Sequence, residues 1–245
     1  MKTITFHCET ITPMFLAGAD GQTPELRPPS IKGALRFWWR AMNGHLPLAE
    51  LKKREGEIFG NGGVNASQSL FSIIADAQNM QIAPKAFVPH KNFMKQEAFI
   101  EGQNFTVKLI FKTDKYIQEI GNLFILTSFL GGFGKRVRRG MGSFKVVEVE
   151  SEHKFSLSAT IENIINILSS FSPYFSFNQG KILTFNSGVQ PKFPYIRSIR
   201  IANYKEKNIL YKISNTTHTT KEEVGEWKYE PNLGYARKEI GRAHV

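Results

Sequence analysis

The order of strand-like and helix-like patterns over the first 150 residues is the feature that most limits how this chain can fold. Four stretches have the alternation or composition of strands: TITFHCETI (3–11), SLFSIIAD (69–76), NFTVKLIFK (104–112) and SFKVVEVE (143–150). Two stretches have the apolar spacing of helices: PPSIKGALRFWWRAM (28–42) and DKYIQEIGNLFILTSFL (114–130). The order strand, helix, strand, strand, helix, strand predicts an α+β fold.

That order is the β-α-β-β-α-β arrangement, the ferredoxin-like plan, and it fills residues 1–150. A second unit is expected after it. Residues 156–171 repeat apolar side chains at helical spacing, and 181–187 and 195–201 have the composition of strands. Most of the remaining residues up to 239 are polar and weakly patterned, so we interpret 151–239 as a partial second domain.

The charge of the chain indicates the class of its partner. The formal net charge is +11 and the isoelectric point is about 9.7. Such a balance favours a polyanion, and nucleic acid is a better candidate than an anionic membrane surface. A basic protein without such a partner is the alternative.

Patterns that would indicate other functions are missing from the sequence. One cysteine, Cys8, excludes an intrachain disulfide framework and a cysteine-rich zinc site. No apolar run is long enough to span a membrane, and the polar start MKTITFHCET is unlike a signal peptide. We therefore expect a cytoplasmic protein that binds no metal and no cofactor. The histidines show no metal-ligand spacing: His7, His45, His90, His153, His218 and His244.

The stretch GGFGKRVRRGMGSF (131–144) places five glycines and four basic residues within twelve positions. It follows a helix and precedes a strand, the reverse of a dinucleotide-binding loop, and Val137 stands where that motif needs its third glycine. Glycines beside cations are typical of an anion-binding nest, although a glycine-rich turn with solvated charges has the same composition. The residues predicted to contact RNA in loop 131–143 are Gly132, Gly134, Lys135, Arg136, Arg138, Arg139 and Gly140.

The helix predicted at 28–42 carries a second basic feature. Lys32, Arg36 and Arg40 recur at every fourth position and form a stripe apart from the apolar face. That apolar face, predicted to be core, comprises Ile31, Leu35, Trp38 and Met42. Trp39 borders the stripe, where its indole either contacts RNA or packs against a neighbouring domain or partner. We predict that the stripe, Trp39 and the glycine loop form one phosphate-binding surface.

Asp20, in the stretch AGADGQ, is the only acid in a glycine-flanked loop near the basic helix. An aspartate before a glycine is most often a turn residue. A catalytic Asp20 in a metal-independent endoribonuclease also remains open, although the sequence places no histidine nearby to share proton transfer. We predict no catalytic residue.

The stretch ITPMFLAGADGQTPELRPPSIKGALRFWWRA (11–41), with EIFG at 57–60, resembles the RAMP proteins of CRISPR systems. Within them it is most similar to the subunit-one family of the Cmr (type III-B) effector complex. The resemblance covers residues 1–150 and is thinner afterwards. It implies two ferredoxin-like RAMP domains in an assembly that holds a CRISPR guide RNA and captures complementary target RNA.

The resemblance also implies partners and a role in antiviral defence. The expected partners are guide RNA, target RNA and other RAMP subunits, at the end of the assembly away from the 5′ tag of the guide. Cleavage of target RNA in such complexes is assigned to a different subunit, so a non-enzymatic RNA-binding subunit is expected. The alternatives are an endoribonuclease that uses Asp20 and a purely structural assembly subunit.

The last residues, EIGRAHV, suggest a non-native end. The codons ATC GGA AGA GCA CAC GTC encode Ile240–Val245, and a widely used short-read sequencing adapter gives this string in this frame. We therefore expect 240–245 to be adapter read-through. About ninety residues follow the first domain, too few for a second full RAMP domain, so the second domain is expected to be truncated.

Overall fold

A computed structural model describes residues 2–62, 66–91, 93–178, 182–185, 188, 191, 193–201 and 208–223. Residues 224–245, which include the predicted non-native end, lie outside the described part. In chain order the elements are β1 (Lys2–Thr10), α1 (Pro28–Met42), α2 (Leu48–Phe59), β2 (Phe71–Asp76), β3 (Ile82–Ala86), β4 (Lys95–Phe99), β5 (Asn104–Phe111), α3 (Ile117–Leu130), the short 3-10 helix η1 (Val137–Arg139), β6 (Phe144–Glu150), α4 (Ile161–Phe171), β7 (Phe175–Asn178), β8 (Ile182–Phe185), β9 (Ser198–Arg200) and α5 (Ile209–Glu223).

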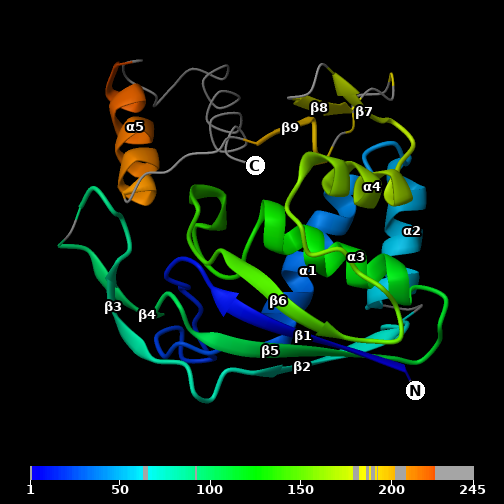
Figure 1. Cartoon of the computed structure of the whole chain (residues 1–245), viewed down its shortest axis with the longest axis horizontal. Coiled ribbons are helices and arrows are strands. Elements are labelled where there is room, and N and C mark those ends of the chain that lie inside the picture. Colours follow the sequence, from blue (N-terminus) through cyan, green and yellow to red (C-terminus); the bar gives the residue numbers. More distant parts are fainter. Residues whose placement is uncertain are drawn as a thin grey trace.

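Four strands form the main sheet in the order β2-β5-β1-β6, and all of its pairs are antiparallel. Phe6 at the middle of β1 pairs with Val107 of β5 and Val149 of β6. Helices α1 and α3 cover one face of this sheet (Figure 1). The predicted α+β fold with its strand-helix-strand-strand-helix-strand order is confirmed, with α2 and the β3–β4 hairpin as additions.

The core lies between the main sheet and the helices. The Phe6 ring stacks on Phe124 of α3 with ring centroids 4.1 Å apart. Helix α3 is apolar on nearly every side because β6, α1 and α4 all pack against it. On α1 the face predicted to be core is buried as expected: Ile31, Leu35, Trp38 and Met42.

The sequence analysis predicts no helix or strand for residues 48–59 and 82–99. The first forms α2, which ends at Gly60, a residue with φ of +82° that a side chain would strain. The second forms the β3–β4 hairpin, whose strands IAPKA and KQEAF are rich in Ala, Lys and Glu, residues that are uncommon in strands. The hairpin extends beyond the main sheet, and α5 lies beyond its far end (Figure 1).

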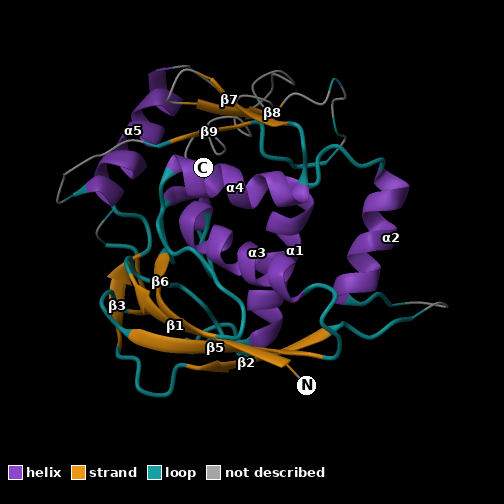
Figure 2. Cartoon of the chain, turned by 45° about the vertical axis from the view of Figure 1, so that its right-hand side comes forward, coloured by secondary structure: helices purple, strands orange, loops and turns teal. Residues whose placement is uncertain are grey.

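The predicted boundary near residue 150 falls at the end of β6, and the core continues across it. Ile164 and Leu168 of α4 belong to the same buried cluster as the residues of the main sheet. Strands β7, β8 and β9 form a separate antiparallel sheet on the side of the helices away from the main sheet (Figure 2). None of the helices in the described part is long and apolar enough to cross a membrane.

Candidate nucleic-acid interface

The glycines of loop 131–143 allow its backbone to pass very close to other backbone. The N–H of Lys135 donates to the Phe15 carbonyl over 2.9 Å, and the N–H of Gly142 donates to the Pro13 carbonyl over 2.9 Å. Gly134 has φ of +98°, and a Cβ there would overlap the Phe15 carbonyl oxygen. Close backbone contact with the segment after β1 therefore explains Gly134, and contact between the two ends of the loop explains Gly132 and Gly142.

The same hydrogen bonds bear on the predicted anion nest. The backbone N–H groups of Phe133, Lys135, Arg139, Gly140 and Gly142 all donate to protein carbonyls. These donors are occupied within the protein. The charged side chains of the loop are therefore better placed to meet a phosphate than these five backbone groups.

Arg136 is the unusual side chain of the loop. Its backbone is left-handed, with φ of +60°, and its guanidinium lies 4.5 Å from the centre of the Phe87 ring. Its Nη1 atom is buried and has no hydrogen-bond partner among the described residues. Burial, followed by the nearby charge of Arg139, lowers the pKa of Arg136. An unpaired buried donor is costly, and an anion would satisfy it.

Further cations lie around Arg136. Lys135 and Arg138 are exposed, and Arg139 is half-buried. His90 of the β3–β4 hairpin has its pKa lowered first by burial and then by His218, with smaller contributions from Lys91, Arg136 and Arg139. We call Lys135, Arg136, Arg138, Arg139, His90 and Lys91 the loop surface. The last two could not be assigned to it from the sequence, because they belong to no motif.

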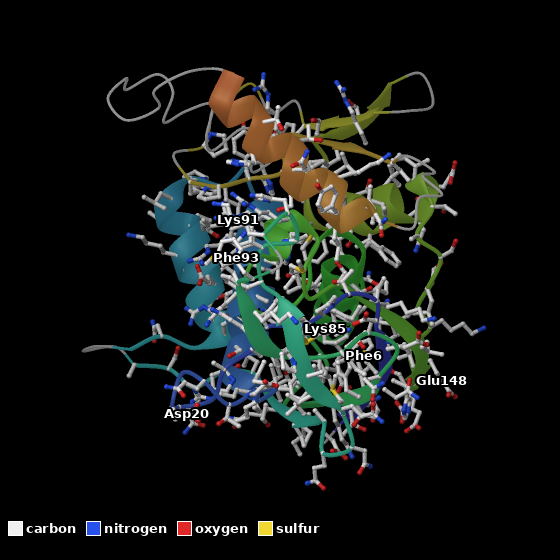
Figure 3. The ribbon with its side chains drawn as sticks, turned by 90° about the vertical axis from the view of Figure 1, so that its left-hand side faces the viewer. Phe6, Asp20, Lys85, Lys91, Phe93 and Glu148 are labelled. Carbon is white, nitrogen blue, oxygen red and sulfur yellow. The ribbon has the colours of Figure 1, made fainter. Side chains whose placement is uncertain are left out.

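Helix α5 packs beside the loop surface. Nδ1 of His90 lies 2.7 Å from the Ser214 hydroxyl, and the rings of His90 and His218 stack with centroids 4.6 Å apart. A pocket of about 470 Å³ lies where α5 meets the loop and the hairpin, lined in part by Pro13, Met141 and Tyr211. The tip of the hairpin carries Phe93, whose side chain is 83% exposed (Figure 3).

The basic stripe of α1 is engaged inside the protein. Arg36 Nε donates to Glu55 Oε1 over 2.7 Å, and Arg40 Nη1 lies 3.5 Å from the same oxygen. Lys32 lies over the Phe71 ring, and burial lowers the pKa of its amine, with smaller contributions from Arg36 and Lys112. Two of the three residues of the stripe, Arg36 and Arg40, therefore neutralise the buried carboxylate of Glu55.

The prediction that stripe and loop form one surface is wrong. A Cβ on Gly131 would overlap the Trp38 indole, so the loop begins directly against Trp38. Trp38 follows Arg36 by two residues, or about 200° around the helix. The start of the loop and the stripe therefore lie on opposite sides of α1.

Of the two roles predicted for Trp39, RNA contact and packing, the structure favours packing. Its side chain is 2% exposed, its ring packs edge-on against Phe59 of α2, and its indole N–H donates to Glu119 Oε1 over 2.8 Å. The packing is internal, because α2 and α3 close over the indole. The alternative of a direct RNA contact has no exposed Trp39 ring to support it.

Asp20 has the contacts of a turn residue. Its Oδ1 accepts from the N–H groups of Gln22 and Thr23, over 2.9 and 3.0 Å, and its Oδ2 accepts from the Thr23 hydroxyl. These hydrogen bonds, that of the Thr23 hydroxyl first, lower the pKa of the carboxyl. Asp20 is exposed in the loop after β1, away from the hairpin tip (Figure 3). The described residues hold no cluster of His, Cys, Asp or Glu that could bind a metal ion.

Known proteins that are similar to this chain include two curated Cmr subunits and one solved Cmr1 structure. The CRISPR system Cmr subunit Cmr1-2 of Pyrococcus furiosus is 28% identical over 58% of this chain and 93% of its own length. Cmr1-1 of the same organism is 31% identical over 64% of this chain, which spans 51% of that relative. The crystal structure of apo Cmr1 from Pyrococcus furiosus superposes with a TM-score of 0.60 and 21% identity, covering 90% of this chain and 72% of that one. The last similarity shows a shared fold.

The sequence pattern of the RAMP superfamily matches residues 7–145, from the second half of β1 to the start of β6. The matched region contains α1, the turn at Asp20 and the whole glycine loop. It covers more than half of the 245 residues, and the similar proteins agree with it. The resemblance found in the sequence is confirmed: this chain belongs to the RAMP superfamily.

Proposed function

We propose that this chain is a non-catalytic RNA-binding subunit of a type III-B CRISPR effector complex. In that complex it contacts guide or target RNA beside other RAMP subunits, as part of cytoplasmic antiviral defence. Two relatives are named Cmr subunits, and membership in the RAMP superfamily agrees with such a role.

The buried, unpaired Nη1 of Arg136 is the observation that carries the proposal. A guanidinium held against Phe87 with an unused donor is prepared for an acceptor that the described residues do not supply. Phosphate is such an acceptor, and a guanidinium can bind it through two parallel hydrogen bonds.

The surroundings of Arg136 favour a chain of phosphates over a single anion. Lys135 and Arg138 are exposed beside it, and Arg139 and Lys91 are near enough to His90 to lower its pKa. Several cations with few acids between them attract successive phosphates of a strand. The stripe of α1, by contrast, holds Glu55 and contributes to folding.

The test is a salt titration of single-stranded RNA binding by the chain and by a triple variant, Arg136→Ala, Arg138→Ala and Arg139→Ala. Removal of each side chain that holds a phosphate lowers the slope of log K against log salt by about 0.7, so the triple variant is expected to have a slope smaller by about 2. A control triple variant removes the same charge from exposed lysines elsewhere: Lys52→Ala, Lys108→Ala and Lys145→Ala.

The control variant is expected to keep its slope within about one unit, because its lysines lie on α2 and the main sheet. If the loop variant binds RNA with the slope of the unchanged chain, the loop is structural and the proposal fails. Crosslinking of guide or target RNA to this subunit in the assembled complex separates an RNA-binding subunit from a structural one.

A further inference from the structure

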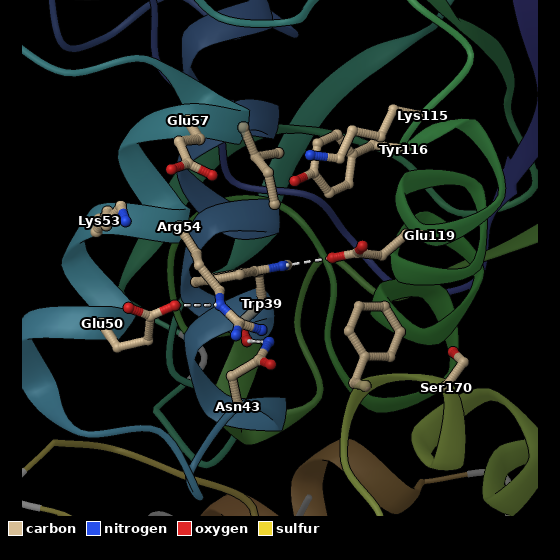
Figure 4. Close-up of a pocket in the computed structure, with 12 residues that line it drawn as sticks. Trp39, Asn43, Glu50, Lys53, Arg54, Glu57, Lys115, Tyr116, Glu119 and Ser170 are labelled. Carbon is tan, nitrogen blue, oxygen red and sulfur yellow. Dashed lines mark hydrogen bonds and ion pairs between the residues drawn. The ribbon is translucent and has the colours of Figure 1, made fainter.

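A pocket of about 340 Å³ lies between α1, α2, α3 and α4 (Figure 4). Its inner end is lined by the buried side chains of Trp39, Ile58 and Phe171. Its outer end carries charged groups of both signs from α2 and the turn before α3: the cations Lys53, Arg54 and Lys115 and the acids Glu50 and Glu57. The pocket thus has buried apolar side chains at its inner end and a charged entrance.

Glu119 of α3 is the acceptor inside this pocket. Its Oε1 accepts from the Trp39 indole N–H over 2.8 Å, as Figure 4 shows, and its Oε2 has no hydrogen bond from any described residue. Burial raises the pKa of this carboxyl, against the opposing effects of Trp39, Arg54 and Lys115. A half-buried carboxylate oxygen with free acceptor capacity favours a ligand that brings N–H donors.

The other residues of the pocket fit a flat ring. Tyr116 adds a half-buried ring to the lining, and the buried rings of Trp39 and Phe171 close its inner end. The Lys115 amine lies 4.9 Å from the centre of the Tyr116 ring, next to the entrance. Bases stack on aromatic side chains, and a phosphate attached to such a base is attracted to cations at the rim.

We infer that this pocket binds one nucleobase that carries an amino group, turned out of the strand. The amino group donates to Glu119 Oε2, and the phosphate of the same nucleotide lies near Lys115 and Lys53. Guanine is the best fit, because its N1–H and its 2-amino group present two neighbouring donors to a carboxylate. Uracil has one N–H between two carbonyl oxygens, which the carboxylate repels.

The inference rests on the proposed function for the source of the nucleotide, since the strand is the RNA held by the complex. The main competing occupant is a guanidinium from a protein neighbour. The cations at the entrance disfavour it: Lys53 and Lys115 repel an entering guanidinium, and Arg54 already pairs with Glu50 over 2.6 Å. Glu57 at the rim offsets only one of these charges.

The test is a calorimetric titration of the chain with guanosine and uridine monophosphates. GMP is expected to bind saturably with a Kd of about 1 mM or tighter, and UMP at least about tenfold more weakly. The variant Glu119→Gln still accepts from the Trp39 indole but presents an amide N–H₂ to the base. It is expected to bind GMP at least about tenfold more weakly and to discriminate GMP from UMP less than about twofold. The control is Glu148→Gln, an exposed carboxylate on β6, which leaves both affinities unchanged.

The inference is overturned if GMP does not saturate the chain, if UMP binds as well as GMP, or if Glu119→Gln leaves GMP binding intact. Binding of N-acetylarginine amide that depends on Glu119, without binding of GMP, assigns the pocket to a protein neighbour instead. If Glu119→Gln does not fold, the ratio of GMP to UMP affinity in the unchanged chain still decides the question. The loop triple variant is expected to bind GMP normally, so failure here and failure of the proposed function are separate outcomes.

Discussion

The Nε atom of Arg36 donates a hydrogen bond of 2.7 Å to Oε1 of Glu55, whose side chain is only 7% exposed. Arg36 lies on α1 and Glu55 on α2, so the pair fastens the two helices together. Arg40 approaches the same oxygen at 3.5 Å. A stripe of cations that resembles a phosphate site in the sequence is thus part of a helix-helix contact.

Removal of the carboxylate is expected to destabilise the fold. Glu55→Ala leaves two guanidinium groups without their shared partner and lowers the free energy of unfolding by about 1–3 kcal/mol. The lower part of that range is expected, because Arg36 and Arg40 are 37% and 44% exposed and water can solvate them. Urea denaturation measures the change, and Glu57→Ala, an exposed position on the same helix, is the control.

The ion pair between Arg36 and Glu55 also has a consequence for the salt dependence of RNA binding. Arg36→Ala is expected to leave the salt slope of RNA binding unchanged, because its guanidinium already holds Glu55. Arg138→Ala is expected to lower that slope by about 0.7, since its exposed side chain is free to meet a phosphate. An equal decrease of slope in both variants would show that Arg36 on the stripe of α1 also contacts RNA.

Two glycine substitutions are expected to have opposite effects on stability. Gly134→Ala places a methyl group against the Phe15 carbonyl oxygen in a backbone with φ of +98°, at a cost of about 1–3 kcal/mol. Gly33 lies on the exposed side of α1, and a Cβ added there would have no neighbouring atom within 4 Å. Gly33→Ala is therefore expected to raise the free energy of unfolding by about 0.5–1 kcal/mol. Thermal unfolding of both variants checks the pair. Equal changes in stability for the two variants would contradict the close backbone contact between Gly134 and Phe15.

The contact of α5 with the hairpin is expected to weaken in acid. Burial, His218, Lys91, Arg136 and Arg139 lower the pKa of His90 below its ordinary 6.5, so the folded state favours the neutral ring. The stabilisation is complete above pH 6.5 and is lost as the pH falls from there through the lowered value. Hydrogen exchange of α5, corrected for its intrinsic pH dependence, should show less protection at about pH 5.5 than at about pH 7.5.

His90→Gln provides the control for that measurement. Its side-chain amide keeps a polar group near the Ser214 hydroxyl but does not titrate. The difference in protection of α5 between the two pH values is therefore expected to shrink. A difference of the same size in this variant would assign the effect to another group.

Asp20→Ala is expected to leave RNA cleavage by the reconstituted complex intact. The carboxylate is occupied by the N–H groups of Gln22 and Thr23, so its removal loosens the turn between Gly18 and Thr23. Gel analysis of the cleavage products provides the measurement. Loss of every product would favour the endoribonuclease alternative.

The order of strands and helices can be predicted from the sequence, because alternation and helical spacing report which side of each element is buried. Leu35, on the apolar face predicted for α1, is fully buried in the core. The β3–β4 hairpin could not be predicted in the same way, because its strands are poor in β-branched and aromatic residues and its exposed sides leave little pattern to detect.

The sequence by itself determined which face of α1 is apolar and where the glycine loop stands in the chain. Only the tertiary structure decided what covers each face. Glu55 meets Arg36 from 19 residues away, and Glu119 meets Trp39 from 80 residues away. Periodicity is a local property and carries no information about such distant partners. A charge paired with a buried carboxylate and a charge left free for phosphate therefore have the same sequence pattern.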